Sequence, residues 1–474
     1  MQTQTQTHRN TFGTTCRKIL SALIVLAALN IRFTCTIACF PGNSGIPFPA
    51  SFAAAEIVCY LLIIYINVFP TLSPHKISTT RCKVLEDGIA LLQIFLATTF
   101  TQIIYCIVML SMTFRIPAEY DAGFNMPVAW LRYLALIVLV EFILFWNGII
   151  RVYATSVQLG IKWRIIGAAC GFIPILHLYV LCRIIRIARN ELLCETEKYL
   201  LNRVRAENQE CRTRYPVLLV HGVFFRDFRF LNYWGRIPAE LIRNGATIFY
   251  GSQQSAASAA CCGGELAGRI RQIVEETGCG KVNIIAHSKG GLDSRCAISR
   301  CGAAPYVASL TTINTPHRGC IFADYLLNHI PASVCRRVAR KYNAALTLLG
   351  DHDPDFMEAV SDLTASACAD LNGLLPDSPH VYYQSVGSQM NRALSGRFPL
   401  NMSYPMVKHF DGPNDGLVSV DSMKWGGSFR CLTVQSGRGI SHGDMIDLNR
   451  ENIAGFDVRE FYVNLVHELK EKGF

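Results

Sequence analysis

The chain has 474 residues, of which 51% are hydrophobic and only 17% are charged, whereas an average soluble domain carries about 25% charged residues. A mean hydropathy of +0.26 excludes a disordered chain and argues against an entirely soluble protein. The net charge is +10, but no long basic run is present, so we expect no nucleic-acid partner and assign the excess to loops beside a membrane. The 19 cysteines show no CxxC pair or zinc-like spacing, which is typical of a reducing compartment rather than a disulfide framework.

Residues 1–185 are predicted to form a transmembrane helical domain of four or five spans. Residues 88–112 hold no charged residue over 25 positions, which is long enough for a helix to cross a hydrocarbon core of ~30 Å. Three other apolar segments contain one or two ionisable side chains each, at residues 19–40, 52–69 and 128–150. The fifth segment, residues 165–182, is borderline because it contains Pro174 and His177. We therefore expect membrane lipids to surround this part of the chain.

Basic residues in the loops indicate an orientation. They gather in the N-terminal tail and in residues 70–87 and 151–164 but are scarce in the intervening loops, which places the N-terminus inside. The fifth segment breaks this alternation, because basic side chains follow it directly. It either crosses against the rule or lies at the interface. The sequence leaves open which side of the membrane the C-terminal domain faces.

Residues 186–210 become charged, with apolar residues at helical spacing, and predict an amphipathic connector helix. From residue 211 onward short apolar strands alternate with helices. The strands are expected at residues 216–221, 246–251, 281–287, 306–314, 380–388 and 429–435, and helices at 237–244, 265–277 and 457–471. Such alternation predicts one α/β domain, residues 211–474, whose mostly parallel sheet is covered by helices on both faces.

One junction between a predicted strand and a predicted helix can carry chemistry. The strand that ends at His287 is followed by Ser288, Lys289, Gly290 and Gly291. Small residues two positions before and after a serine permit the sharp turn that lifts a nucleophilic hydroxyl above a sheet. The alternative is a Ser-Gly turn with no chemical role.

A serine hydroxyl needs a base, which in turn needs an orienting acid, and in this setting they follow the serine in the order acid, then histidine. Asp415 lies in a turn-rich segment, and His442 follows the last predicted strand. Both therefore fall on loops at the same edge of the sheet as Ser288. Asp411 is the main competitor for the acid and Asp421 a lesser one.

A tetrahedral oxyanion needs preorganised donors. The backbone N–H of Lys289 directly follows the nucleophile, and the loop after the first strand of the domain offers the N–H of Val223. The side chain of Lys289 is not required for this role. Its charge could help to hold a fatty carboxylate product, but we expect it to be solvated. Candidates for lining a substrate pocket are Phe224, Phe225 and His317.

The segments PVLLVHG, AHSKGG, NDGLV and ISHGD, in that order, resemble the bacterial triacylglycerol lipases of the α/β-hydrolase fold. The match extends to NYWG at residues 232–235 and TINTPHRG at residues 312–319, and it excludes the apolar half. The resemblance implies Ser288 as nucleophile, Asp415 as acid and His442 as base, with oxyanion donors at Val223 and Lys289. It also implies a lid or cap at about residues 318–375, for which the alternative is an ordinary helical insertion.

The resemblance implies no required cofactor. Some relatives bind a structural calcium through an aspartate two residues after the catalytic histidine, and Asp444 occupies that spacing. No partner carboxylate can be identified, so Asp444 is only a weak calcium candidate.

The predicted function is that of a membrane-anchored serine ester hydrolase, with an acylglycerol lipase as the favoured form and a lipid ester as substrate. One alternative is another acyl chemistry on the same triad, in a phospholipase, thioesterase or acyltransferase. The other is a non-enzymatic membrane interaction module. The oligomeric state stays open.

Overall fold

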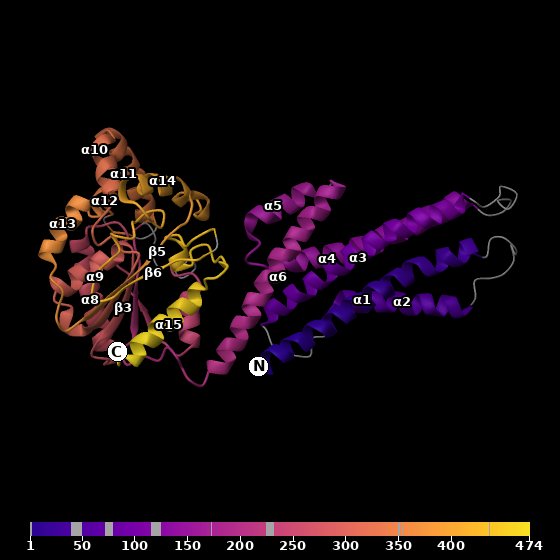
Figure 1. Ribbon diagram of the computed structural model, residues 1–474, viewed down its shortest axis with the longest axis horizontal. Coiled ribbons are helices and arrows are strands. Elements are labelled where there is room, and N and C mark those ends of the chain that lie inside the picture. Colours follow the sequence, from indigo (N-terminus) through magenta and orange to yellow (C-terminus); the bar gives the residue numbers. More distant parts are fainter. Residues whose placement is uncertain are drawn as a thin grey trace. The chain divides into compact units, whose positions relative to one another are not determined.

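The computed structural model describes residues 2–38, 50–71, 79–114, 125–171, 173–223, 232–348, 351–352, 354–435 and 437–474. The chain divides into two compact units, Met1–Leu201 and Asn202–Phe474 (Figure 1). All cysteines in these ranges have free thiols.

The first unit is built from helices. They are α1 (Gln2–Ala38), α2 (Ala50–Val68), α3 (Thr80–Thr113), α4 (Met126–Thr155), α5 (Gly160–Cys170) and most of α6 (Pro174–Arg205). Within the described residues, three helical stretches are long and apolar enough to cross a membrane, namely Thr15–Ile37, Thr80–Thr113 and Met126–Thr155, and Ala53–Val68 is a shorter apolar helix. Many of their large apolar side chains are exposed, as at Ile57 and Leu61 of α2.

The fifth predicted segment is not one helix. Helix α5 ends at Cys170 and α6 begins at Pro174, because proline lacks an amide donor and suits the first turn of a helix better than its interior. Helix α6 then continues to Arg205, so the connector predicted at residues 186–210 is the second part of a longer helix rather than a separate element.

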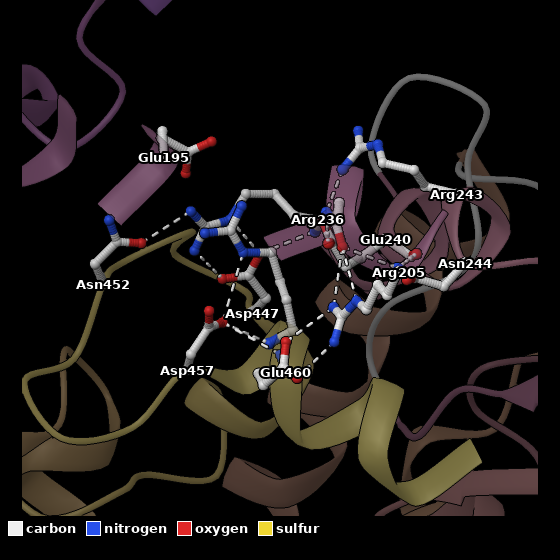
Figure 2. Close-up of polar contacts among 12 residues, drawn as sticks. Glu195, Arg205, Arg236, Glu240, Arg243, Asn244, Asp447, Asn452, Asp457 and Glu460 are labelled. Carbon is white, nitrogen blue, oxygen red and sulfur yellow. Dashed lines mark hydrogen bonds and ion pairs between the residues drawn. The ribbon is translucent and has the colours of Figure 1, made fainter. Parts of the chain in front are cut away.

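The end of α6 that belongs to the second unit is held by polar contacts (Figure 2). The guanidinium of Arg205 donates to both carboxylate oxygens of Glu460, at 2.7 and 3.0 Å. Asn202 donates to Glu240, and Asn244 donates to Asn202 at 3.2 Å. These contacts join the end of the helix to the body of the unit.

The second unit contains a six-stranded, wholly parallel sheet. Its strands are β1 (Val217–Val220), β2 (Ile248–Tyr250), β3 (Val282–His287), β4 (Val307–Ile313), β5 (Tyr382–Ser388) and β6 (Phe429–Leu432), in the order β2-β1-β3-β4-β5-β6. Each lies within a predicted strand. Strands β1, β3 and β4 are buried along their whole length, as their continuous apolar runs predict.

Helices cover both faces of this sheet, because successive side chains of a strand point to opposite sides. Val217 and Leu219 of β1 pack in a cluster with α7 (Ile237–Arg243) and α15 (Val458–Glu471), whereas Leu218 and Val220 pack with α8 (Ala259–Thr277) and α9 (Lys289–Ser299). Helix α8 begins six residues before its predicted start because the side chain of Ser258 caps it. The α/β-hydrolase fold preceded by a helical region is confirmed.

Two insertions lie between the later strands. Between β4 and β5 come α10 (Ile321–His329), α11 (Ala332–Leu348), α12 (Phe356–Ser361) and α13 (Ala365–Leu374), and between β5 and β6 comes α14 (Leu400–Asp411) (Figure 1). The first insertion coincides with the predicted lid segment.

Candidate active site

Ser288 occupies a strained turn at the carboxyl end of β3. Its backbone has φ +55° and ψ −133°, immediately before α9, a region that residues other than glycine adopt only when the surroundings hold them there. The Ser288 N–H donates to the carbonyl of Ile313 at 2.9 Å, and the Thr315 hydroxyl donates to the Ser288 carbonyl at 2.8 Å. The end of β4 and the residues that follow it therefore hold the turn.

Glycines allow other backbone segments to pass close to this turn. A Cβ at Gly290 would lie 2.4 Å from the carbonyl oxygen of His221, and one at Gly291 would lie 2.2 Å from Oγ1 of Thr315. On the loop after β1, a Cβ at Gly222 would lie 2.8 Å from the Ser288 Cβ. The loop that contains Val223 therefore approaches the serine closely.

Asp415 and His442 form a buried pair. His442 Nδ1 donates to Asp415 Oδ2 at 2.6 Å, and the two residues are 7% and 0% exposed, respectively. Oδ1 of Asp415 accepts from the backbone N–H groups of Leu417 and Val418 at 2.9 and 2.8 Å. A proton on Nδ1 leaves Nε2 of His442 as a proton acceptor, which a general base requires.

The structure brings these loops to the end of β3. The ring of His287, the residue before Ser288, has its centroid 4.5 Å from that of His442. The rival acids lie elsewhere: Asp411 accepts from the backbone of Ile321 and Phe322 at the start of α10, and Asp421 pairs with the Lys424 ammonium group.

The candidate oxyanion residues have different surroundings. Val223 is buried in a cluster with Leu346 of α11 and Ala359 of α12, so the first insertion packs against the candidate oxyanion loop. Phe224 and Phe225, the predicted pocket residues that follow it, lie outside the described residues.

The side chain of Lys289 is not solvated, and that expectation was wrong. It is 1% exposed, and its Nζ lies 2.5 Å from Oδ1 of Asp293 one helical turn later. Burial raises the pKa of Asp293 to about 6, although the ion pair opposes this shift. The lysine side chain therefore forms a structural ion pair with Asp293 inside the domain.

His317 is fully buried, so its ring is not exposed to a substrate in this structure. Its Nε2 lies 2.9 Å from the Thr312 hydroxyl, and its ring stacks on Trp425 with centroids 5.2 Å apart.

Asp444, the weak calcium candidate, is engaged by donors of the protein itself. One carboxylate oxygen accepts from the N–H and hydroxyl of Ser441 at 2.8 and 2.7 Å, and the other accepts from Arg438 at 2.9 Å. No group of three or more His, Cys, Asp or Glu side chains is placed to hold a metal ion among the described residues. Through Ser441, Asp444 stabilises the loop that carries His442.

Two further residues hold the candidate site together, and the sequence alone assigns neither of them a role. Asn314, with φ +48°, donates to Oδ2 of Asp415 at 2.7 Å. The hydroxyl of Tyr233 accepts from the Gly222 N–H at 3.0 Å and lies 2.7 Å from Nδ1 of His287. Both residues occur in the segments of the family resemblance, which was the available signal.

Comparison with known proteins finds relatives among the triacylglycerol lipases. No family model matches the chain. It is 36% identical over 179 residues to a triacylglycerol lipase of Pseudarthrobacter phenanthrenivorans, covering 35% of this chain and 55% of that protein. It is 29% identical over 239 residues to a triacylglycerol lipase of Vibrio cholerae, covering 45% and 75%. This chain is similar to triacylglycerol lipases. The predicted resemblance is thus confirmed.

The coverage of these relatives is partial. The chain spans about half the length of the P. phenanthrenivorans lipase and of a Burkholderia plantarii triacylglycerol lipase, at 55% and 49%. Among solved structures, the Staphylococcus hyicus lipase aligns with a TM-score of 0.45 and 18% identity, over 55% of this chain and 97% of that one.

Proposed function

We propose that this chain is a membrane-anchored serine ester hydrolase whose favoured substrate class is the acylglycerols. The observation that carries the proposal is the 2.6 Å hydrogen bond from His442 to Asp415, made beside a strand end where Ser288 stands in a strained turn. The similarity to triacylglycerol lipases supports it.

In the proposed reaction, Nε2 of His442 takes the proton of the Ser288 hydroxyl while Oγ attacks the ester carbonyl carbon. The backbone N–H groups of Val223 and Lys289 donate to the oxyanion of the tetrahedral intermediate. The intermediate collapses to an acyl-enzyme, and His442 returns the proton to the departing alcohol. A water molecule, deprotonated by His442, then attacks the acyl carbon; His442 returns this proton to Oγ of Ser288 as the C–O bond to the serine breaks, which releases the fatty acid and restores the serine hydroxyl.

The apolar helices would hold the hydrolase unit at a membrane, where lipid esters are concentrated. The first insertion, packed on Val223 through Leu346 and Ala359, would serve as a lid over the site. Membrane lipids would be both the surroundings of the first unit and the source of substrate.

The test is labelling of the purified full chain with a fluorophosphonate probe, combined with ester turnover. Ser288→Ala is expected to abolish labelling and to lower kcat by about 10⁴–10⁶, as loss of a triad serine does elsewhere. Ser299 is the last residue of α9, the helix that Ser288 directly precedes. Ser299→Ala is therefore the matched control and should label like the wild type. A Ser288→Ala variant that keeps more than a tenth of the activity would contradict the assignment.

A substrate panel separates the acyl chemistries. Acylglycerols should show the highest kcat/KM among acylglycerols, phospholipids and acyl thioesters. A higher value for either other class would assign a phospholipase or thioesterase, and transfer of the acyl group to an added alcohol in preference to water would assign an acyltransferase. Wild-type protein that is folded but does not label would favour the non-enzymatic module.

A further inference from the structure

The loop that carries His442 is anchored to a second segment by a partly buried ion pair. Asp447, five residues after His442, is 2% exposed. Its Oδ2 accepts from the backbone N–H and Nε of Arg236 at 2.8 and 2.7 Å, and its Oδ1 accepts from Nη2 at 2.8 Å (Figure 2). A bidentate pair of this kind fixes the relative orientation of the two groups.

The segment that supplies Arg236, residues 232–236, is also packed tightly on this loop. Gly235 has φ +52°, and a Cβ there would lie 2.4 Å from the carbonyl oxygen of Asp447. Trp234 is fully buried, with its ring edge-on to that of Tyr462 at 5.9 Å, and the Tyr462 hydroxyl donates to the Met445 carbonyl at 3.0 Å.

The same segment holds the candidate oxyanion loop. The Tyr233 hydroxyl accepts from the N–H of Gly222, the residue before Val223, and it also contacts His287, the residue before Ser288. Residues 232–236 therefore contact three parts of the candidate site. Arg236 holds the loop that carries His442, here called the base loop. Tyr233 holds the candidate oxyanion loop, which carries Val223, and the turn that carries Ser288.

We propose that Arg236 and Tyr233 are positioning residues that set the base loop and the oxyanion loop relative to one another. This inference rests on the proposed function. The reaction needs the Val223 N–H and His442 Nε2 to meet one tetrahedral centre at the same time. A misplacement of about 1 Å can cost about a hundredfold in rate, so a segment that fixes both loops contributes to kcat.

Conservative variants of the full chain test the inference. Arg236→Lys keeps the positive charge but loses the planar fork, and Tyr233→Phe removes a single oxygen atom. Arg243→Gln is the matched control, because Arg243 pairs with Glu240 and is mostly exposed. The measurements are kcat and KM on the soluble ester p-nitrophenyl butyrate, the rate of fluorophosphonate labelling, and the thermal unfolding midpoint.

We expect Arg236→Lys and Tyr233→Phe each to lower kcat by about 10- to 100-fold, with KM within about twofold of the wild type. Labelling should slow in parallel, because phosphylation of the serine needs the same base and oxyanion donors. The unfolding midpoint of Tyr233→Phe should stay close to that of wild type and Arg243→Gln. A merely structural role would lower the midpoint and leave kcat of the folded enzyme unchanged, and this result would overturn the inference.

A double variant tests the shared support. Because both residues act through one segment, the effects of Arg236→Lys and Tyr233→Phe on kcat should be less than multiplicative when combined, and fully multiplicative effects would overturn the claim of a common support. The proposed function fails in a different way: wild-type protein would not label, or Ser288→Ala would label like the wild type. The inference alone fails when wild type labels and both conservative variants label at the same rate.

Discussion

At the scale of single residues, the interior beside the candidate nucleophile holds a lysine and an aspartate where apolar side chains would be expected. Lys289 and Asp293 are 1% and 2% exposed, and each is the other's counter-charge at 2.5 Å. A buried pair of this kind adds little net stability compared with apolar residues, but the loss of one partner leaves an uncompensated charge in the interior.

We therefore predict that Asp293→Leu lowers the free energy of unfolding of the second unit by about 3–5 kcal/mol. The double variant Asp293→Leu/Lys289→Met should recover most of this loss, because neither charge then remains buried. Denaturant unfolding of the full chain in detergent measures both. A double variant as unstable as Asp293→Leu would show that the cost arises from packing rather than from the unpaired charge.

At the scale of elements, α11 is the part of the first insertion that buries little of its surface. Helix α11 buries only Ala339 and Leu346, while Val334, Val338 and Tyr342 expose apolar side chains at successive turns. Just beyond it, Oδ2 of Asp351 accepts from the N–H and hydroxyl of Ser255 at 3.1 and 2.6 Å. In the proposed lid, the hydrogen bonds between Asp351 and Ser255 help to hold the insertion in its closed position.

We predict that Asp351→Ala increases amide hydrogen exchange in α11 and α12 by about tenfold or more, because a hydrogen bond to a charged group contributes about 1.5–3 kcal/mol. Exchange in β3 and β4 should not change. Asp370→Ala, an exposed position on α13, removes a charge without this contact and serves as the control. Unchanged exchange in α11 of the Asp351 variant would contradict the claim that the Asp351–Ser255 hydrogen bonds hold the insertion in place.

At the scale of the whole molecule, the chain joins two units of opposite character. The first has apolar side chains on its outside and the second has a conventional buried core. Such an apolar exterior on long helices is stable in lipid and costly in water.

We predict that the full chain stays in the membrane pellet after washing with alkaline carbonate, which strips proteins bound only at the surface. Detergent should release it. A catalytically silent Ser288→Ala chain should behave in the same way, since substrate binding does not hold it there. Release by carbonate alone would show that the apolar helices do not span the bilayer.

Much of the fold could be predicted because its signals are local. The apolar segments of the first unit and the six strands of the second are recorded in hydropathy and in spacing over short windows, and their helices and strands lie where those patterns indicate. The fifth apolar segment was harder, because a proline within an apolar run is compatible with a kinked helix or with a new start. Only the structure separates α5 from α6 there.

The sequence by itself determined the order of the six strands, the apolar first half and the order of the candidate triad residues, because these are properties of neighbours along the chain. Only the tertiary structure decided which polar groups pair. Arg236 and Asp447 are separated by 211 positions, and Lys289 pairs with Asp293 instead of reaching solvent. Such partnerships depend on which elements pack together and which side chains lose water, and no short window of sequence records that.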